Sequence, residues 1–206
     1  SSIAIESQVD ERYLLEWLSS NAARGYVTYD DDRQLFSLSP EQAAVFAREN
    51  EPTCIQGLIQ GVVGQFVNQD TAIDVFQTGR GRPWGEHHEC CFCGTERFFR
   101  PAYATHLLEE WIPALEGVEE KLRNGTKVAD IGCGLGTSSI LMAENFPNSI
   151  IHAYDFHAPS IEEARKRAES QGLKNVEFFV ADAADIRNEG YDLACIFDAW
   201  HCLLYT

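Results

Sequence analysis

The sequence is short of basic residues. Its 206 residues include 16 Lys and Arg against 32 Asp and Glu, so the formal net charge at pH 7 is -16. A polyanion repels phosphate backbones. One small basic cluster, Arg80 with Arg82, lies outside the expected helices. We therefore expect no nucleic-acid partner.

Long apolar runs are also missing. No stretch approaches the ~18 apolar residues that suggest a membrane helix, and Ser1 does not begin a signal-peptide pattern. The seven cysteines are odd in number and lack the spacing of a disulfide framework, which is typical of reduced thiols. Together these absences predict a soluble, cytoplasmic protein with no membrane partner.

A second C-x-x-C pair is absent as well, although the run HHECCFC at 87–93 is rich in donors. One short segment rarely supplies four tetrahedral zinc ligands alone. We therefore expect no metal. The surrounding stretch at 79–99, GRGRPWGEHHECCFCGTERFF, is predicted to be a long loop.

The second half of the chain alternates strand-like and helix-like stretches. Strands are expected at 127–131, 149–155, 176–182 and 191–200, with helices at 137–146 and 160–172. In the second helix Ser160 and Glu163 have capping-box spacing, and Glu162 and Glu163 precede basic residues by four positions. The alternation predicts an α/β fold with a parallel sheet.

A glycine loop joins the first expected strand to its helix. Asp130 is followed by Gly132, Gly134 and Gly136, in the pattern D-x-G-x-G-x-G. The dinucleotide fingerprint is G-x-G-x-x-G, so the third glycine here comes one residue early. An acid at this loop repels phosphate and attracts a cation, which disfavours an NAD-dependent oxidoreductase.

Two more acids end the following strands. Asp155 closes the second strand, where ribose hydroxyls need an acceptor, and Asp182 closes the third, near an adenine amine. S-adenosylmethionine carries a sulfonium and an ammonium beside an adenosine. The ordered acids fit this cofactor better than a dinucleotide.

The first part of the chain predicts a different architecture. Residues 11–25 form an amphipathic helix with Leu14, Trp17 and Leu18 on one stripe, followed by two short β-like runs around a DDDR turn. Ser39 and Gln42 then have capping-box spacing at the start of a further helix. Helix, hairpin and helix make the back half of a winged helix, whose front helices residues 1–10 are not expected to supply.

Residues 53–77 look helical but contain Gly57, Gly61 and Gly64. Such glycines permit close helix packing; the alternative is a flexible helix.

Several motifs resemble those of class I S-adenosylmethionine-dependent methyltransferases: VADIGCGLG, YDFHAPSIEEAR, VADAAD and YDLACIFDAWH. The segments GRPWGEHH, GTERFFRP and EEWIPALEGVEEKL are similar to a bacterial subgroup with an N-terminal winged-helix domain. The resemblance implies a Rossmann-like methyltransferase domain at 127–206, with the first four strands of a seven-stranded sheet. It also implies a partial winged-helix, mainly helical dimerisation domain at 1–78, and a linker loop with helices at 79–126.

The resemblance also implies cofactor-binding roles. Asp130 and the three glycines would hold the methionine part, Asp155 the ribose, and the other positions the adenine and the region of the transferred methyl. The implied cofactor-binding residues are Asp130, Gly132, Gly134, Gly136, Asp155, Phe156, His157, Asp182, Ala183, Phe197 and Asp198.

The methyl acceptor is expected to be an unidentified small molecule. Methyl transfer is an in-line displacement that depends mainly on alignment, and a general base is needed only if the acceptor must lose a proton. His201, His87 and His88 are the candidates for such a base.

A homodimer through the N-terminal domain is expected, because the stripe on residues 11–25 would form part of an apolar surface. A transcription regulator with S-adenosylmethionine as effector is an alternative. The acidic DDDR turn opposes it, since a wing tip faces DNA phosphates.

Overall fold

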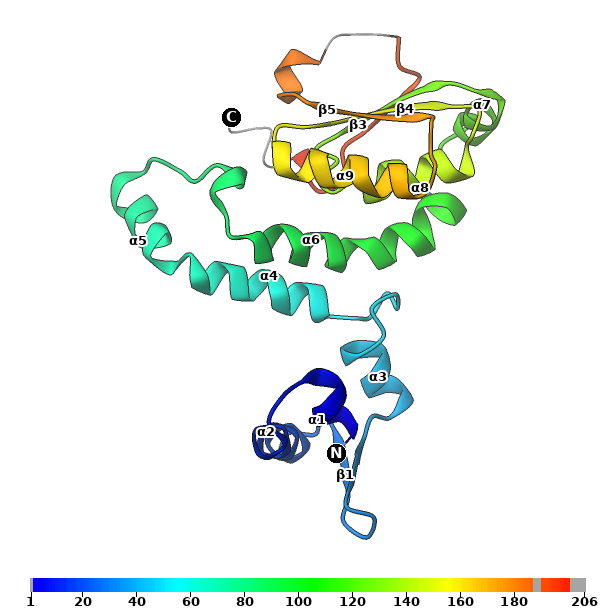
Figure 1. Ribbon diagram of the computed structural model, residues 1–206. Helices are drawn as coiled ribbons and strands as arrows, with labels where there is room; N and C mark the ends of the chain where they lie inside the picture. Colours follow the sequence, from blue (N-terminus) through cyan, green and yellow to red (C-terminus); the bar gives the residue numbers. More distant parts are fainter. Residues whose placement is uncertain (1, 187–189, 201–206) are drawn as a thin grey trace. The chain divides into compact units, whose positions relative to one another are not determined.

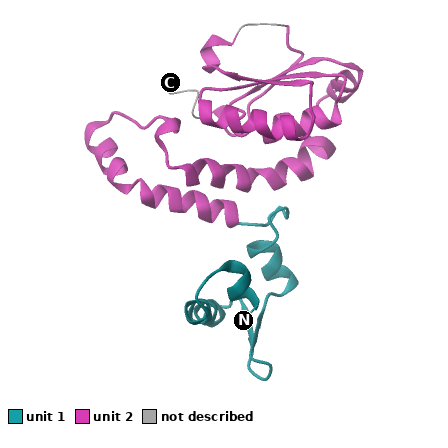
Figure 2. Cartoon of the chain, viewed as in Figure 1, with its two compact units in different colours: residues 1–55 teal, residues 56–206 magenta. Residues whose placement is uncertain are grey.

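The computed structural model describes residues 2–186 and 190–200. The chain forms two compact units, residues 1–55 and 56–206, coloured separately in Figure 2. The helices expected at 53–77 therefore belong almost wholly to the second unit, and the three-part division drawn from the sequence stays a prediction. Among the described residues, none of the helices combines the length and the apolar character that a membrane span requires.

The first unit has the element order of a winged helix. Its elements are α1 (Ser2–Ser7), α2 (Glu11–Ala23), β1 (Thr28–Asp30), β2 (Leu35–Ser37) and α3 (Pro40–Phe46), with β1 and β2 antiparallel. The expectation that residues 1–10 supply no helix was wrong, because α1 lies there. This helix is too short for a clear periodic pattern, and burial of Ala4, which is 7% exposed, favours it.

The capping box predicted at Ser39 is confirmed. The Ser39 hydroxyl accepts from the Gln42 amide, and the Ser39 amide donates to Gln42 Oε1 at 2.8 Å. Gln42 Nε2 also donates to the Gly25 carbonyl at 2.8 Å, so this side chain ties α3 to the residues before the hairpin.

The second unit opens with helices. They are α4 (Gln56–Val67), α5 (Gln69–Thr78), the short 3-10 turn η1 (Trp84–Glu86), α6 (Glu89–Ala102), the π-helical segment η2 (Tyr103–Trp111) and α7 (Val118–Asn124). Figure 1 shows α4 running alongside α6.

Close packing is confirmed at Gly57 and Gly64 of α4, whereas a Cβ at Gly61 would have open space. A Cβ added at Gly57 would lie 2.3 Å from the Phe98 amide nitrogen, and one added at Gly64 would lie 2.9 Å from that of Cys91. From the opposite side, a Cβ on Gly94 would lie 2.3 Å from the Gly61 nitrogen. The glycines therefore let the two helix backbones meet without side chains between them.

The prediction of a long loop at 79–99 was wrong for its second half, which forms α6. His88 caps this helix, since its Nδ1 accepts from the Cys90 amide at 3.2 Å. Cys91 is 2% exposed, and Gly94 fits against α4. Packing on another helix thus stabilises a segment whose own sequence looks irregular.

A four-stranded parallel sheet completes the second unit. Its strands are β3 (Lys127–Ile131), β4 (Ile150–Asp155), β5 (Val176–Val180) and β6 (Leu193–Cys195), in the order β5-β4-β3-β6. Helices α8 (Thr137–Asn145) and α9 (Ala158–Ser170) connect the strands, and the short turn η3 (Ala183–Asp185) follows β5. The predicted Rossmann-like fold class is confirmed, although the last strand is shorter than expected.

The main core lies between the sheet and its helices. Val128 and Ile151 on adjacent strands are fully buried with Leu122 of α7 and Met142 of α8. This packing holds β3 and β4 in place, and the site is built at their carboxyl ends.

The capping box predicted at Ser160 was wrong. Helix α9 begins at Ala158, and Pro159 occupies its first turn, where a missing N–H costs nothing. Ser160 lies inside the helix, 2.8 Å from His157 Nδ1. The two i,i+4 ion pairs, Glu162–Lys166 and Glu163–Arg167, are confirmed.

Candidate cofactor site

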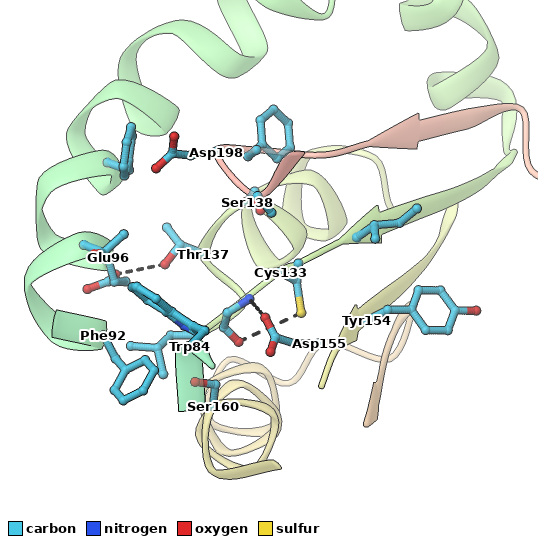
Figure 3. A pocket seen from close by; sticks show the side chains of 18 of the residues that line it. Trp84, Phe92, Glu96, Cys133, Thr137, Ser138, Tyr154, Asp155, Ser160 and Asp198 are labelled. Atoms are coloured by element: carbon cyan, nitrogen blue, oxygen red, sulfur yellow. Dashed lines mark hydrogen bonds between the residues drawn. The ribbon is translucent and has the colours of Figure 1, made fainter. Parts of the chain in front are cut away.

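A cavity of about 250 Å³ lies at the carboxyl ends of the strands. Residues that follow each of the four strands line it, and α6 contributes a wall (Figure 3). The carboxyl edge of a parallel sheet is where ligands of such folds bind.

The glycine loop follows β3. Gly132, Gly134 and Gly136 have φ angles of +75°, +52° and +78°, which side-chain-bearing residues rarely adopt. A Cβ on Gly136 would lie 2.7 Å from the Phe178 ring, so this glycine permits α8 to pack on the sheet. Gly134 lines the cavity, and a Cβ there would meet nothing within 4 Å. It therefore presents bare backbone toward a ligand.

Asp155 lies beside this loop at the end of β4. Its Oδ2 accepts from the Gly134 amide at 2.9 Å (Figure 3), and its Oδ1 accepts from the His157 amide at 2.8 Å. Asp155 is 7% exposed and lines the cavity. Each oxygen retains a lone pair, so the carboxylate can accept two further hydrogen bonds from a ligand.

Asp130 lies behind the loop and is 1% exposed. Ser138 and Ser139 donate to its Oδ2 at 2.7 and 2.5 Å, while its Oδ1 has no hydrogen-bond partner among the described residues. Burial raises the pKa of this carboxyl, and the two serine hydroxyls act in the opposite direction. Asp130 is not among the described residues that line the cavity, and its contact with a cofactor stays a prediction.

Glu96 of α6 also lines the cavity, and no sequence motif had singled it out. Thr137, the first residue of α8, donates its hydroxyl to Glu96 Oε1 at 2.9 Å (Figure 3). The side chain is 10% exposed and also lies 3.4 Å from Arg167 Nη1. Because residues 79–99 were expected to form a loop, nothing predicted that Glu96 would meet the start of α8.

The charge of the lining is of one sign. Its ionised side chains are the carboxylates of Glu96, Asp155 and Asp198, and none of the described lining residues is Lys, Arg or His. Such a surface attracts a cation and repels a pyrophosphate.

Aromatic side chains line the cavity in two groups, which we call the aromatic walls. Trp84, Phe92 and Phe156 form the first, and Phe92 stacks on His157 with ring centroids 4.4 Å apart. Tyr103 and Phe197 form the second, with centroids 5.3 Å apart. Burial raises the pKa of the Tyr103 hydroxyl, which therefore stays neutral.

Most of the predicted cofactor residues come together. Those that line the cavity are Gly132, Gly134, Asp155, Phe156, Ala183, Phe197 and Asp198. Gly136 and His157 pack directly behind this set, and Asp182 caps η3 by accepting from the Ala184 amide at 2.9 Å. Their individual roles toward a cofactor stay predictions.

The candidate bases are placed less favourably. His88 uses its Nδ1 to cap α6. His87 packs against Trp84 with centroids 5.3 Å apart, and burial lowers its pKa. Neither is among the described lining residues, and His201 lies outside the described residues. Across residues 2–186 and 190–200, no three His, Cys, Asp or Glu side chains group as metal ligands.

The parallel sheet, the glycine loop after β3 and the acid at the end of β4 define a Rossmann-like fold, and the cavity lies at the sheet edge where ligands of such folds bind. Residues 122–204 match the family model described as "Methyltransferase domain", and residues 1–48 match that of the "Rv2258c-like winged HTH domain". These two segments are therefore similar to a methyltransferase domain and to a winged-helix domain, as the resemblance predicted.

Individual relatives agree with this. The chain is 42% identical over 60 residues to the aklanonic acid methyltransferase DauC of Streptomyces sp. (strain C5), covering 29% of this chain and 27% of that protein. The structure of the mitomycin 7-O-methyltransferase MmcR is similar with a TM-score of 0.66 and 17% identity, covering 97% of this chain and 60% of the other. The structure of an O-methyltransferase family protein from Burkholderia thailandensis is similar with a TM-score of 0.58 and 17% identity, covering 93% of this chain and 57% of the other. These two structures support the fold, and the chain spans about a quarter of the length of DauC.

Proposed function

We propose that the protein is an S-adenosylmethionine-dependent methyltransferase that acts on a small molecule. The observation that carries this proposal is the cavity beside the glycine loop, whose described charged lining residues are all acids. S-adenosylmethionine is a cation at its sulfonium, whereas NAD would bring a pyrophosphate to the same carboxylates. The site therefore favours the sulfonium cofactor and disfavours hydride transfer.

The residues present fit this cofactor. The open backbone at Gly134 leaves room for its methionine part, and the two oxygens of Asp155 suit the two ribose hydroxyls. Trp84 and Phe156 are positioned to contact a planar base. When bound, the cofactor supplies a methyl group that is already activated by the sulfonium.

The chain's own contribution to the reaction is alignment. The sheet edge and the two aromatic walls fix the cofactor and exclude water, so that an acceptor meets the methyl in line. Phe197 and Asp198 follow β6 and line the cavity, which suits them to the acceptor side. The names of MmcR and the Burkholderia protein make a hydroxyl the first acceptor group to test.

Calorimetry with S-adenosylhomocysteine and with NAD tests the proposal. We expect binding of the first at micromolar or tighter affinity and no heat from the second. NAD binding without S-adenosylhomocysteine binding would refute it.

The winged-helix match keeps a regulatory function as the second candidate. Its turn carries exposed Asp31 and Asp32, and Arg33 lies 3.9 Å from Asp30, so the turn is poorly suited to phosphates. A salt-dependent shift of duplex DNA would favour this candidate.

A homodimer through the N-terminal unit remains part of the proposal. Trp17 of the predicted stripe is 60% exposed, whereas Leu14 and Leu18 are half-buried. A cytoplasmic location also stays a prediction; it is supported by free cysteines at every cysteine position described.

A further inference from the structure

We propose that Glu96 binds the α-ammonium group of the cofactor's methionine part and thereby selects ligands that carry an amino-acid tail. The inference rests on the proposed function. It assigns the cation-binding role to an acid from α6, outside the residues that match the methyltransferase domain.

The position of Glu96 supports this role. Thr137, which donates to it, directly follows Gly136 of the glycine loop. The methionine part is expected to lie along that loop, so Glu96 is next to it. Asp155, by contrast, is held by the Gly134 and His157 amides at the end of β4, where the ribose is expected.

The contacts of Glu96 leave it able to accept from a ligand. Its described hydrogen bonds and ion pairs all meet Oε1, from Thr137 at 2.9 Å, Arg167 at 3.4 Å and Arg100 at 3.8 Å. They fix the carboxylate and engage one oxygen, so that Oε2 keeps its lone pairs. Neither arginine is among the described lining residues, and an ammonium in the cavity meets the carboxylate first.

Burial strengthens the interaction. The Glu96 side chain is 10% exposed, so an ion pair there is screened less than one at the surface. The buried Asp130 carboxylate is engaged by Ser138 and Ser139 and is not among the described lining residues. Of the two acids near the start of α8, Glu96 is the one that the cavity exposes.

Two ligands separate this role from a purely structural one. S-adenosylhomocysteine carries the ammonium, and 5′-methylthioadenosine keeps the adenosine and thioether but lacks the amino-acid tail. In the full chain, Glu96→Gln should lower the affinity for S-adenosylhomocysteine by about 10- to 100-fold, as expected for the loss of a charge-assisted hydrogen bond. It should change the affinity for 5′-methylthioadenosine by less than about twofold.

Two further variants serve as controls. Glu89→Gln makes the same charge change at an exposed position of α6 and should leave both affinities unchanged. Thr137→Val removes the hydroxyl that holds Oε1 while keeping the carboxylate. Thr137→Val should lower the affinity for S-adenosylhomocysteine less than Glu96→Gln does.

The outcomes are distinct. If Glu96→Gln and Thr137→Val lower the affinities for both ligands equally, Glu96 only connects α6 to α8 and the inference is overturned. The same conclusion follows if Glu96→Gln leaves S-adenosylhomocysteine binding unchanged. If the native protein binds neither ligand, the proposed function itself fails. Melting temperatures of all variants show whether each is folded.

Discussion

Replacing Asp155 by Ala should weaken both the cofactor site and the fold around it. The carboxylate accepts from the Gly134 and His157 amides, so its removal leaves two backbone donors without their acceptor. An exposed strand-end acid that holds no backbone donors would not have this effect. The structure instead makes Asp155 a support of the glycine loop.

The magnitudes follow from these bonds. An unsatisfied buried donor costs about 1–3 kcal/mol. Because water can reach the cavity, we expect the low end, about 2 kcal/mol for the pair, which lowers the melting temperature by about 4–8 °C in a unit of this size. Loss of two charge-assisted bonds to the ribose, at ~1.5–3 kcal/mol each and not additive, lowers the affinity by about 10- to 1000-fold.

Differential scanning calorimetry and titration of the same sample with S-adenosylhomocysteine measure both effects. Asp185→Ala is a matched control, because it removes one exposed carboxylate from η3 after the next strand. It should alter neither quantity. An Asp155→Ala protein that binds the ligand within about twofold of the native affinity would refute the assigned role.

Three further outcomes are expected. Gly94→Ala should destabilise the protein by several kcal/mol, because its Cβ would lie 2.3 Å from the Gly61 nitrogen. Gly61→Ala has open space around its Cβ and should be neutral or stabilising. Chemical denaturation of the two variants compares their free energies of unfolding. Burial raises the pKa of Asp130, so the stability it contributes is lost as pH rises from the ordinary carboxyl value through the folded value. Asp130→Asn should therefore gain melting temperature relative to the native protein as the pH rises above the ordinary carboxyl value, and a constant difference across the pH range would contradict this. Light scattering should show a dimer at micromolar concentration, and Trp17→Ser should shift it toward monomer; a monomeric native protein would count against the dimer.

The strands and their acids could be predicted because each is encoded locally. Apolar runs ending at Asp130 and Asp155 mark β3 and β4, and the glycine spacing marks the loop between sheet and helix. The parallel topology then brings the strand ends together without further information. These patterns were sufficient for the fold class and for Gly132, Gly134 and Asp155 at the cavity, whereas Phe156, Ala183, Phe197 and Asp198 were predicted only through the family resemblance.

Helix α6 could not be predicted in the same way. Its residues include Gly94, three cysteines and Pro101, none of which indicates a helix, and its stability comes from contact with α4. Glu96 and Phe92 reach the cavity only because that contact exists. Sequence periodicity does not report which distant segment a helix will pack on, so this wall was missed.

The cavity and the segment that matches the methyltransferase model do not share a boundary in this chain. A fragment that begins at residue 122, where the methyltransferase match starts, would keep the sheet, the glycine loop and Asp155, yet lose the wall formed by α6. Such a fragment would open the cavity to solvent on the side of Phe92, Glu96 and Phe99. Exchanging the matched segment between relatives at that boundary would therefore transfer the half of the cavity that holds the glycine loop and leave behind the helix that closes it.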